Sequence, residues 1–162
     1  MSVENPRRST VVICGSMKNL RLMTAVGELL VDAGLRVITP VPDEPEGDWS
    51  AGSSLAMKRA ASRRHMSYIR DRETEAILVV NTDRNGSSNY VGPNSFAEIS
   101  VAFADDRRIF LLQGMPTSYA EELEAWGVEC LDGDLNRFAR ALGSLGDIDA
   151  ARWRSTFRCV AV

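Results

Sequence analysis

Short apolar runs alternate with longer amphipathic segments along most of the chain. The runs 10–14 and 76–80 are continuous and rich in β-branched residues, a pattern typical of parallel strands buried on both faces of a sheet. Three shorter, partly apolar runs are also predicted to be strands of the sheet. The strands predicted in chain order are 10–14, 35–39, 76–80, 108–112 and 128–131.

The segments between these runs have apolar residues at helical spacing. After the first strand, Leu22, Val26, Leu29 and Leu30 recur three or four residues apart, and Gly34 provides a C-terminal stop. The predicted helices are 20–33, 54–73, 95–104, 117–126 and 134–142, the last of them capped by Asp132 or Asp134.

Alternating strands and helices predict an α/β domain of three layers, in which a mostly parallel five-stranded sheet carries helices on both faces. We place this domain at 10–145, after a flexible N-terminus at 1–9. The tail at 146–162 has too little pattern for an assignment, and we expect it to dock on the domain or on a partner subunit.

Composition narrows the classes of function. With 44% hydrophobic residues, 25% charged residues and a net charge of −3, the chain has no bias towards polyanions, so a nucleic acid polymer is not an expected partner. Cys14, Cys130 and Cys159 form no CxxC pair, so neither a disulfide framework nor a zinc knuckle is expected. No apolar run suits a signal peptide or a membrane span, which makes the cytoplasm the expected location.

Open parallel sheets bind ligands outside the carboxyl ends of their strands, and the loop after the first strand lies there. It contains the candidate binding residues Gly15, Ser16, Met17 and Lys18. Glycine lets the backbone approach a ligand, and the following helix N-terminus offers N–H groups to an anion. The alternative is a plain strand-to-helix turn with a serine cap.

The second candidate loop, 81–93, follows the central strand and opens a helix, so its side chains should face the same crevice. It is polar and rich in glycine and serine. The candidate substrate-binding residues in and just after it are Asn81, Tyr90, Gly92, Asn94 and Ser95.

Glu98 is the candidate nucleophile. An ionised carboxylate at a helix N-terminus, beside a glycine-rich loop, can attack an anomeric carbon and capture it as a glycosyl ester. The alternative is structural, because Ser95 and Glu98 have the S-x-x-E spacing of a capping box.

His65 is the only histidine of the chain. It shares a helix face with Ala61 and Ile69, so a core position and a catalytic position as acid or base are both open. Four cationic residues near it predict either a solvated face or, less favoured, an anion clamp or subunit contact. These residues are Lys58, Arg59, Arg63 and Arg64.

With these residues in place, the sequence resembles the nucleoside 2-deoxyribosyltransferase-like superfamily, which includes 2′-deoxynucleoside 5′-monophosphate N-hydrolases. The resemblance implies a Rossmann-like or flavodoxin-like fold, a homodimer or higher homo-oligomer, Glu98 as nucleophile, phosphate binding near Gly15 and Ser16 and near Asn94 and Ser95, and no cofactor or metal. The segments that carry it are 13–17, His65 with Ile69, 76–81, 90–95 with Glu98, and 119–135.

The residue that assists the leaving base has no match in this chain. In family members it is an aspartate from the helix before the central strand, where this chain has Ser67 beside His65.

The function that the resemblance implies is cleavage of the N-glycosidic bond of a nucleoside or nucleoside 5′-monophosphate, by hydrolysis or deoxyribosyl transfer. A non-catalytic nucleotide sensor is the alternative. A flavodoxin-like or dinucleotide-binding redox protein is less favoured, because the first turn lacks G-x-G-x-x-G.

Overall fold

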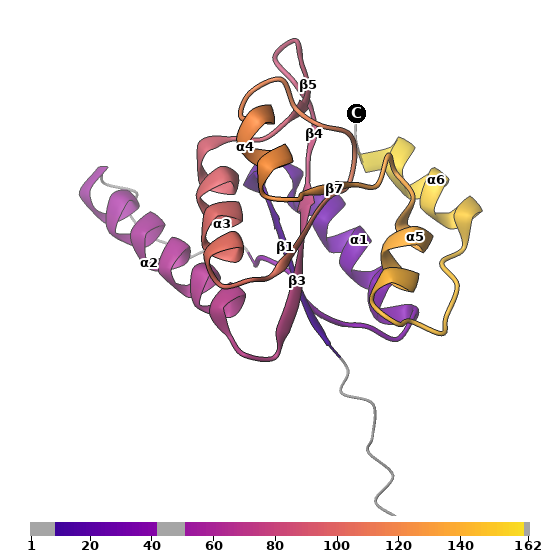
Figure 1. Cartoon of the computed structure of the whole chain (residues 1–162). Coiled ribbons are helices and arrows are strands. Elements are labelled where there is room, and N and C mark those ends of the chain that lie inside the picture. Colours follow the sequence, from indigo (N-terminus) through magenta and orange to yellow (C-terminus); the bar gives the residue numbers. More distant parts are fainter. Residues whose placement is uncertain (1–8, 42–50, 161–162) are drawn as a thin grey trace, which may run out of the picture.

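A computed structural model describes residues 9–41 and 51–160 of the chain (Figure 1). Five parallel strands form one sheet in the order β2-β1-β3-β6-β7. Counted in sequence among these five, this is the order 2-1-3-4-5 of flavodoxin-like folds. The fold class predicted from the sequence is confirmed. The strands are β1 (Thr10–Gly15), β2 (Arg36–Ile38), β3 (Thr74–Val80), β6 (Arg108–Leu111) and β7 (Glu129–Cys130).

Helices cover both faces of the sheet, and each face has its own apolar core (Figure 1). Along β1, Val11 and Ile13 point into one core, and Val12 and Cys14 point into the other. Cys14 therefore belongs to the face that α2 and α3 cover. The first face carries α1 (Leu20–Asp32), α5 (Leu135–Ala141) and α6 (Ala150–Val160), and the second carries α2 (Ala51–Arg70), α3 (Pro93–Ala104) and α4 (Ala120–Ala125).

The tail forms helix α6 and packs against α1. Trp153 is buried in the first core, and its indole Nε1 donates a 2.8 Å hydrogen bond to the carbonyl of Gly133. Arg152 pairs with Asp32 of α1 over 2.7 Å. The tail thus docks on its own domain, one of the two expected arrangements.

The segment 81–93, expected as an irregular polar loop, instead contains a two-stranded hairpin. Strands β4 (Thr82–Arg84) and β5 (Ser87–Tyr90) pair antiparallel. Asn85 and Gly86 connect them with φ angles of 50° and 76°, the left-handed backbone that a tight hairpin turn requires. The sequence interpretation relied on the polarity of this segment and overlooked the Asn-Gly signal.

Smaller differences concern the ends of elements. A short 3₁₀ turn, η1 (Met17–Asn19), precedes α1, and α2 begins at Ala51 and ends at Arg70 rather than spanning 54–73. Residues 42–50, between the second predicted strand and the second predicted helix, and the N-terminal residues 1–8 lie outside the described residues. None of the helices in the described ranges combines the length and the apolarity that crossing a membrane requires.

Candidate functional site

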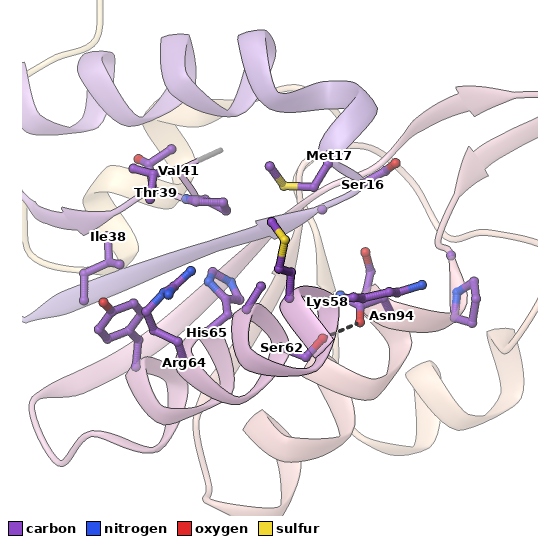
Figure 2. A pocket seen from close by; sticks show the side chains of 18 of the residues that line it. Ser16, Met17, Ile38, Thr39, Val41, Lys58, Ser62, Arg64, His65 and Asn94 are labelled. Atoms are coloured by element: carbon purple, nitrogen blue, oxygen red, sulfur yellow. Dashed lines mark hydrogen bonds between the residues drawn. The ribbon is translucent and has the colours of Figure 1, made fainter. Parts of the chain in front are cut away.

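A cavity of about 740 Å³ lies at the carboxyl ends of β1 and β2, bounded by α2 and by the start of α3 (Figure 2). Strands β2 and β3 lie on opposite sides of β1, so the chain reverses its direction of winding here, which is where open α/β sheets bind ligands. The volume lies within the range of about 300–1,000 Å³ that is typical of small-molecule sites.

The first predicted loop contributes Gly15, Ser16 and Met17 to the cavity wall. Gly15 is needed for packing, because a Cβ there would lie 3.1 Å from the carbonyl oxygen of Val80 and 3.0 Å from the sulfur of Met23. Lys18 does not line this cavity; it lines a much smaller adjoining one of about 20 Å³.

The hairpin β4–β5 places Arg84 and Tyr90 in the same wall. The guanidinium of Arg84 donates a 3.3 Å hydrogen bond to the Ser16 hydroxyl, and it lies 5.4 Å from the centroid of the Tyr90 ring. The sequence interpretation missed Arg84. Its position shortly after the carboxyl end of the central strand was the available signal.

Helix α3 begins at the cavity with Gly92, Asn94 and Ser95 among the lining residues. Gly92 is the N-cap and Pro93 the first helical residue, so Ser95 lies at the third helical position. Ser95 and Glu98 are therefore not a capping box. The N–H groups of Asn94 and Ser95 belong to the first helical turn, where no intrahelical acceptor is available.

The opposite end of the cavity carries apolar side chains from the end of β2 and the residues after it, beside Thr39 and Arg64 (Figure 2). Figure 2 shows Ile38 and Val41 at this end and Ser16, Lys58 and Asn94 at the other. Ile38 ends β2 and the residues 39–41 follow it directly, and this place at a strand end is the only signal in the sequence.

Helix α2 forms one long side of the cavity through Lys58, Arg64, His65 and Tyr68. His65 and Tyr68 contact edge to face, with ring centroids 6.5 Å apart. Of the four cationic residues in question, Lys58 and Arg64 line the cavity, and Arg59 and Arg63 do not.

Asn81 was predicted to bind substrate, but it lies beneath the hairpin and lines no described cavity. Its side chain is 1% exposed. The amide donates to the carbonyls of Asn89 and Gly114 over 3.1 and 2.9 Å, and its oxygen accepts from the N–H of Gln113 over 2.9 Å. These bonds tie the hairpin to the segment after β6, which is a structural role.

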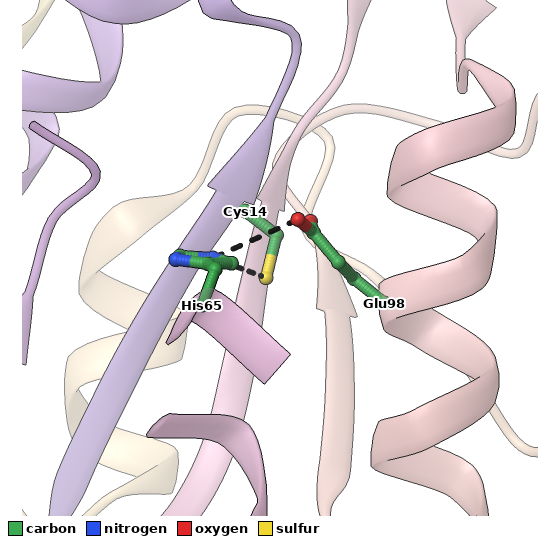
Figure 3. Close-up of side chains that lie close together, drawn as sticks. All are labelled: Cys14, His65 and Glu98. Carbon is green, nitrogen blue, oxygen red and sulfur yellow. Dashed lines mark hydrogen bonds and ion pairs between the residues drawn. The ribbon is translucent and has the colours of Figure 1, made fainter. Parts of the chain in front are cut away.

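Glu98 lies behind the cavity wall, where it meets His65 of α2 and Cys14 of β1 (Figure 3). It is 4% exposed and is absent from the lining. His65 Nε2 lies 3.5 Å from the Cys14 sulfur and 4.0 Å from Glu98 Oε1. Asn94 donates a 3.1 Å hydrogen bond to the same Oε1, and the buried Oε2 has no hydrogen-bond partner.

Burial controls the protonation of this cluster. Desolvation raises the pKa of Glu98 from 4.5 to about 7, although hydrogen bonds from Cys14 and Asn94 oppose the shift. Desolvation also raises the pKa of the Cys14 thiol and lowers the pKa of His65. At neutral pH the thiol is protonated, the imidazole is neutral, and Glu98 is divided between its two forms.

Comparisons with known proteins give no family for this chain. No family model matches, and no curated protein matches. One similar solved structure is FerB, a flavoenzyme NAD(P)H:(acceptor) oxidoreductase from Paracoccus denitrificans. It is 14% identical with a TM-score of 0.41, and the alignment covers 94% of this chain and 93% of that one. This likeness is too low to carry the activity of that protein over to this chain.

The geometry of the site corrects the function expected from the sequence. The carboxyl of Glu98 lies outside the cavity lining and is largely protonated below pH 7, so it is not a free carboxylate facing a bound sugar. Cleavage of an N-glycosidic bond through Glu98 is therefore not retained. Membership of the deoxyribosyltransferase-like superfamily stays a prediction, and so does the assembly of this chain into a homo-oligomer.

Proposed function

We propose that this chain binds a mononucleotide in the cavity, with the phosphate at the end formed by Ser16 and Arg84 and the planar ring at the end formed by Ile38 and Val41. The class includes nucleoside 5′-monophosphates and flavin mononucleotide, which share one phosphate, one sugar or sugar alcohol and one flat heteroaromatic ring.

The observation that carries this proposal is the charge of the lining. Lys58, Arg64 and Arg84 line the cavity, and no Asp or Glu is among the described residues that do so. The chain as a whole has a net charge of −3, so the cavity departs from the general character of the protein. A cationic concave site raises the local concentration of anionic ligands.

The shape of the polar end supports phosphate binding. Arg84 and Ser16 are already in contact, and Asn94 and Ser95 of the first turn of α3 line the same cavity. Charged donors and a helix N-terminus together favour an oxyanion with several acceptor oxygens.

The remainder of the cavity suits a flat ring. Ile38, Val41 and Met57 offer apolar contacts, and Tyr68 and His65 offer aromatic ones. A phosphate alone would leave this part without contacts, whereas a base or an isoalloxazine ring would fill it.

The first test is a panel of ligands added to the purified full-length chain, with thermal stability as the measurement. Inorganic phosphate, nucleosides, nucleoside 5′-monophosphates, riboflavin and flavin mononucleotide form the panel. A ligand at about 100 times its Kd stabilises the folded state by about 2.7 kcal/mol. If only flavin mononucleotide stabilises the protein, and the protein with bound ligand is yellow, the cavity is a flavin site. If a purine or pyrimidine monophosphate stabilises it, that ligand identifies the base that the cavity prefers.

Matched variants locate the site. Arg84→Ala removes a cation from the cavity, and Arg140→Ala removes one from the exposed face of α5. A charge-assisted hydrogen bond contributes about 1.5–3 kcal/mol, so Arg84→Ala should weaken binding by roughly 10-fold to 100-fold and Arg140→Ala should not change it. If no member of the panel binds, the proposal is wrong.

A further inference from the structure

Three elements far apart in the sequence bring a thiol, an imidazole and a carboxyl together behind the cavity. Cys14 comes from β1, His65 from α2 and Glu98 from α3 (Figure 3). One potential ligand atom from each lies within 4.8 Å of the others. Within the described residues, no other group of three such side chains is this compact.

Two of the three separations are close to those of a tetrahedral metal site, and all three ligand atoms lie within 4.8 Å of one another. Zinc bonds of about 2.3 Å to sulfur and about 2.0–2.2 Å to nitrogen and oxygen place neighbouring ligand atoms about 3.3–3.6 Å apart. The 3.5 Å between Cys14 Sγ and His65 Nε2 already fits. The 4.0 Å between His65 Nε2 and Glu98 Oε1 needs a shift of roughly half an ångström, within reach of a small side-chain rotation.

The unpartnered oxygen of Glu98 is the second observation. Oε2 is buried and accepts no hydrogen bond, although a buried acceptor without a partner costs about 1–3 kcal/mol. A cation bound between this carboxyl, the thiol and the imidazole would satisfy it.

The surroundings hold two of the three groups in place. Asn94 donates a hydrogen bond to Glu98 Oε1, and His65 makes a backbone hydrogen bond with Ile13. Outer partners of this kind, an amide on the carboxylate and a backbone group on the imidazole, orient the ligands of metal sites.

We propose that Cys14, His65 and Glu98 bind one Zn²⁺ ion, with the fourth coordination position open towards the cavity. A thiolate with an imidazole selects zinc over the hard cations Mg²⁺ and Ca²⁺. His65 is the one member of the three that lines the cavity, which places the open position on that side. Binding replaces water on the hydrated ion by Zn–S, Zn–N and Zn–O bonds, and it releases the thiol proton of Cys14 and, from the protonated fraction of Glu98, the carboxyl proton to solvent.

Three protein ligands and one open position are the arrangement of zinc sites that activate water or polarise a substrate. Neither the spacing of the cysteines nor a motif in the sequence predicted it. The inference does not depend on the mononucleotide proposal, because zinc uptake is measured without a nucleotide and each can fail alone.

The test uses the reduced full-length chain, stripped with a chelator and then titrated with Zn²⁺ against a chromophoric competitor. We expect one equivalent to bind. Replacing Zn²⁺ by Co²⁺ should give the visible bands of a tetrahedral site and the ultraviolet band of a cobalt–thiolate bond. Failure of the wild-type chain to take up one equivalent would overturn the proposal, whatever the variants do.

Variants assign the ligands. Cys14→Ser and Glu98→Gln keep side-chain size and should weaken Zn²⁺ binding at least about 100-fold, more than the loss of an outer partner does. The cobalt–thiolate band should vanish in Cys14→Ser and persist in Cys130→Ser and Cys159→Ser, whose sulfurs lie elsewhere. Loss of the band in Cys130→Ser or Cys159→Ser, or Zn²⁺ binding of wild-type strength in Cys14→Ser, would refute the assignment.

Discussion

The side-chain amide of Asn94 donates a 3.1 Å hydrogen bond to the buried carboxyl group of Glu98, four residues further along α3. Asn94 lines the cavity, and Glu98 lies behind it. The amide thus links the proposed ligand site to the buried cluster, in addition to His65, which belongs to both.

Replacing Asn94 by Ala should destabilise the protein by about 1–3 kcal/mol, because Glu98 Oε1 would lose the Asn94 donor while the buried Oε2 already has none. Urea denaturation measures the change. Ser62→Ala is the matched control, since it removes only the long 3.5 Å hydrogen bond on the other side of Asn94. Equal effects from the two substitutions would contradict this account.

Glu98 should make the stability of the metal-free protein depend on pH. Its pKa is raised from 4.5 to about 7 on folding, so between these values the folded chain holds a proton that the unfolded chain has lost. The free energy of unfolding should therefore fall as pH rises from about 4.5 to about 7, by about 3 kcal/mol in total, and this contribution should be constant above about pH 7.

Urea denaturation of the wild type and of Glu98→Gln in chelator, at about pH 5, 6, 7 and 8, isolates this contribution. His65 affects the free energy of unfolding in the opposite direction, because its lowered pKa destabilises the folded state as pH falls below about 6.5. Since both proteins contain His65, its contribution cancels in the difference between them. The free energy of unfolding of the wild type minus that of Glu98→Gln should fall as pH rises. A difference that does not vary with pH would rule out the raised pKa.

The hairpin turn should be sensitive to Gly86. Its φ of 76° disfavours any side chain, and a Cβ added there would meet no atom within 4 Å beyond the adjoining residues, so Gly86→Ala tests the backbone alone. We expect a loss of about 1 kcal/mol and weaker ligand binding, because the hairpin carries Arg84 and Tyr90. Ser88→Ala, at an exposed position of the same hairpin, should change neither property.

Asn81 should matter for stability rather than for ligand recognition. Asn81→Ala removes three hydrogen bonds of a buried amide and leaves the carbonyls of Asn89 and Gly114 without their donor. We expect a loss of about 3 kcal/mol or more in urea denaturation. A variant of normal stability that binds ligand poorly would show instead that Asn81 contacts the ligand.

Strands and helices with a clear local pattern of apolar residues could be predicted from the sequence. The run 76–80 was identified as the central strand because each of its residues is apolar, and all of them are buried. The hairpin was missed, since its strands are short and polar and only Asn85 and Gly86 mark the turn. The cavity could be placed at the strand ends, but its apolar end at 38–41 has no motif.

The buried cluster shows what a sequence alone does not reveal. Cys14, His65 and Glu98 are separated by 51 and 33 positions, and only the packing of α2 and α3 on β1 brings them together. Cys14 belongs to no CxxC pair and gave no sign of a site, and Glu98 was placed in the open crevice because the start of α3 was set two residues late.

The measurement that tests the central proposal most directly is calorimetric titration with matched pairs of ligands, each nucleoside 5′-monophosphate against its nucleoside and flavin mononucleotide against riboflavin. For the pair that binds, the phosphate should strengthen binding to the wild type at least about tenfold, through the charge-assisted contacts at Ser16 and Arg84, and most of that gain should be lost in Arg84→Ala. Equal affinities within every pair, or an unchanged gain in Arg84→Ala, would contradict a phosphate site at this end of the cavity.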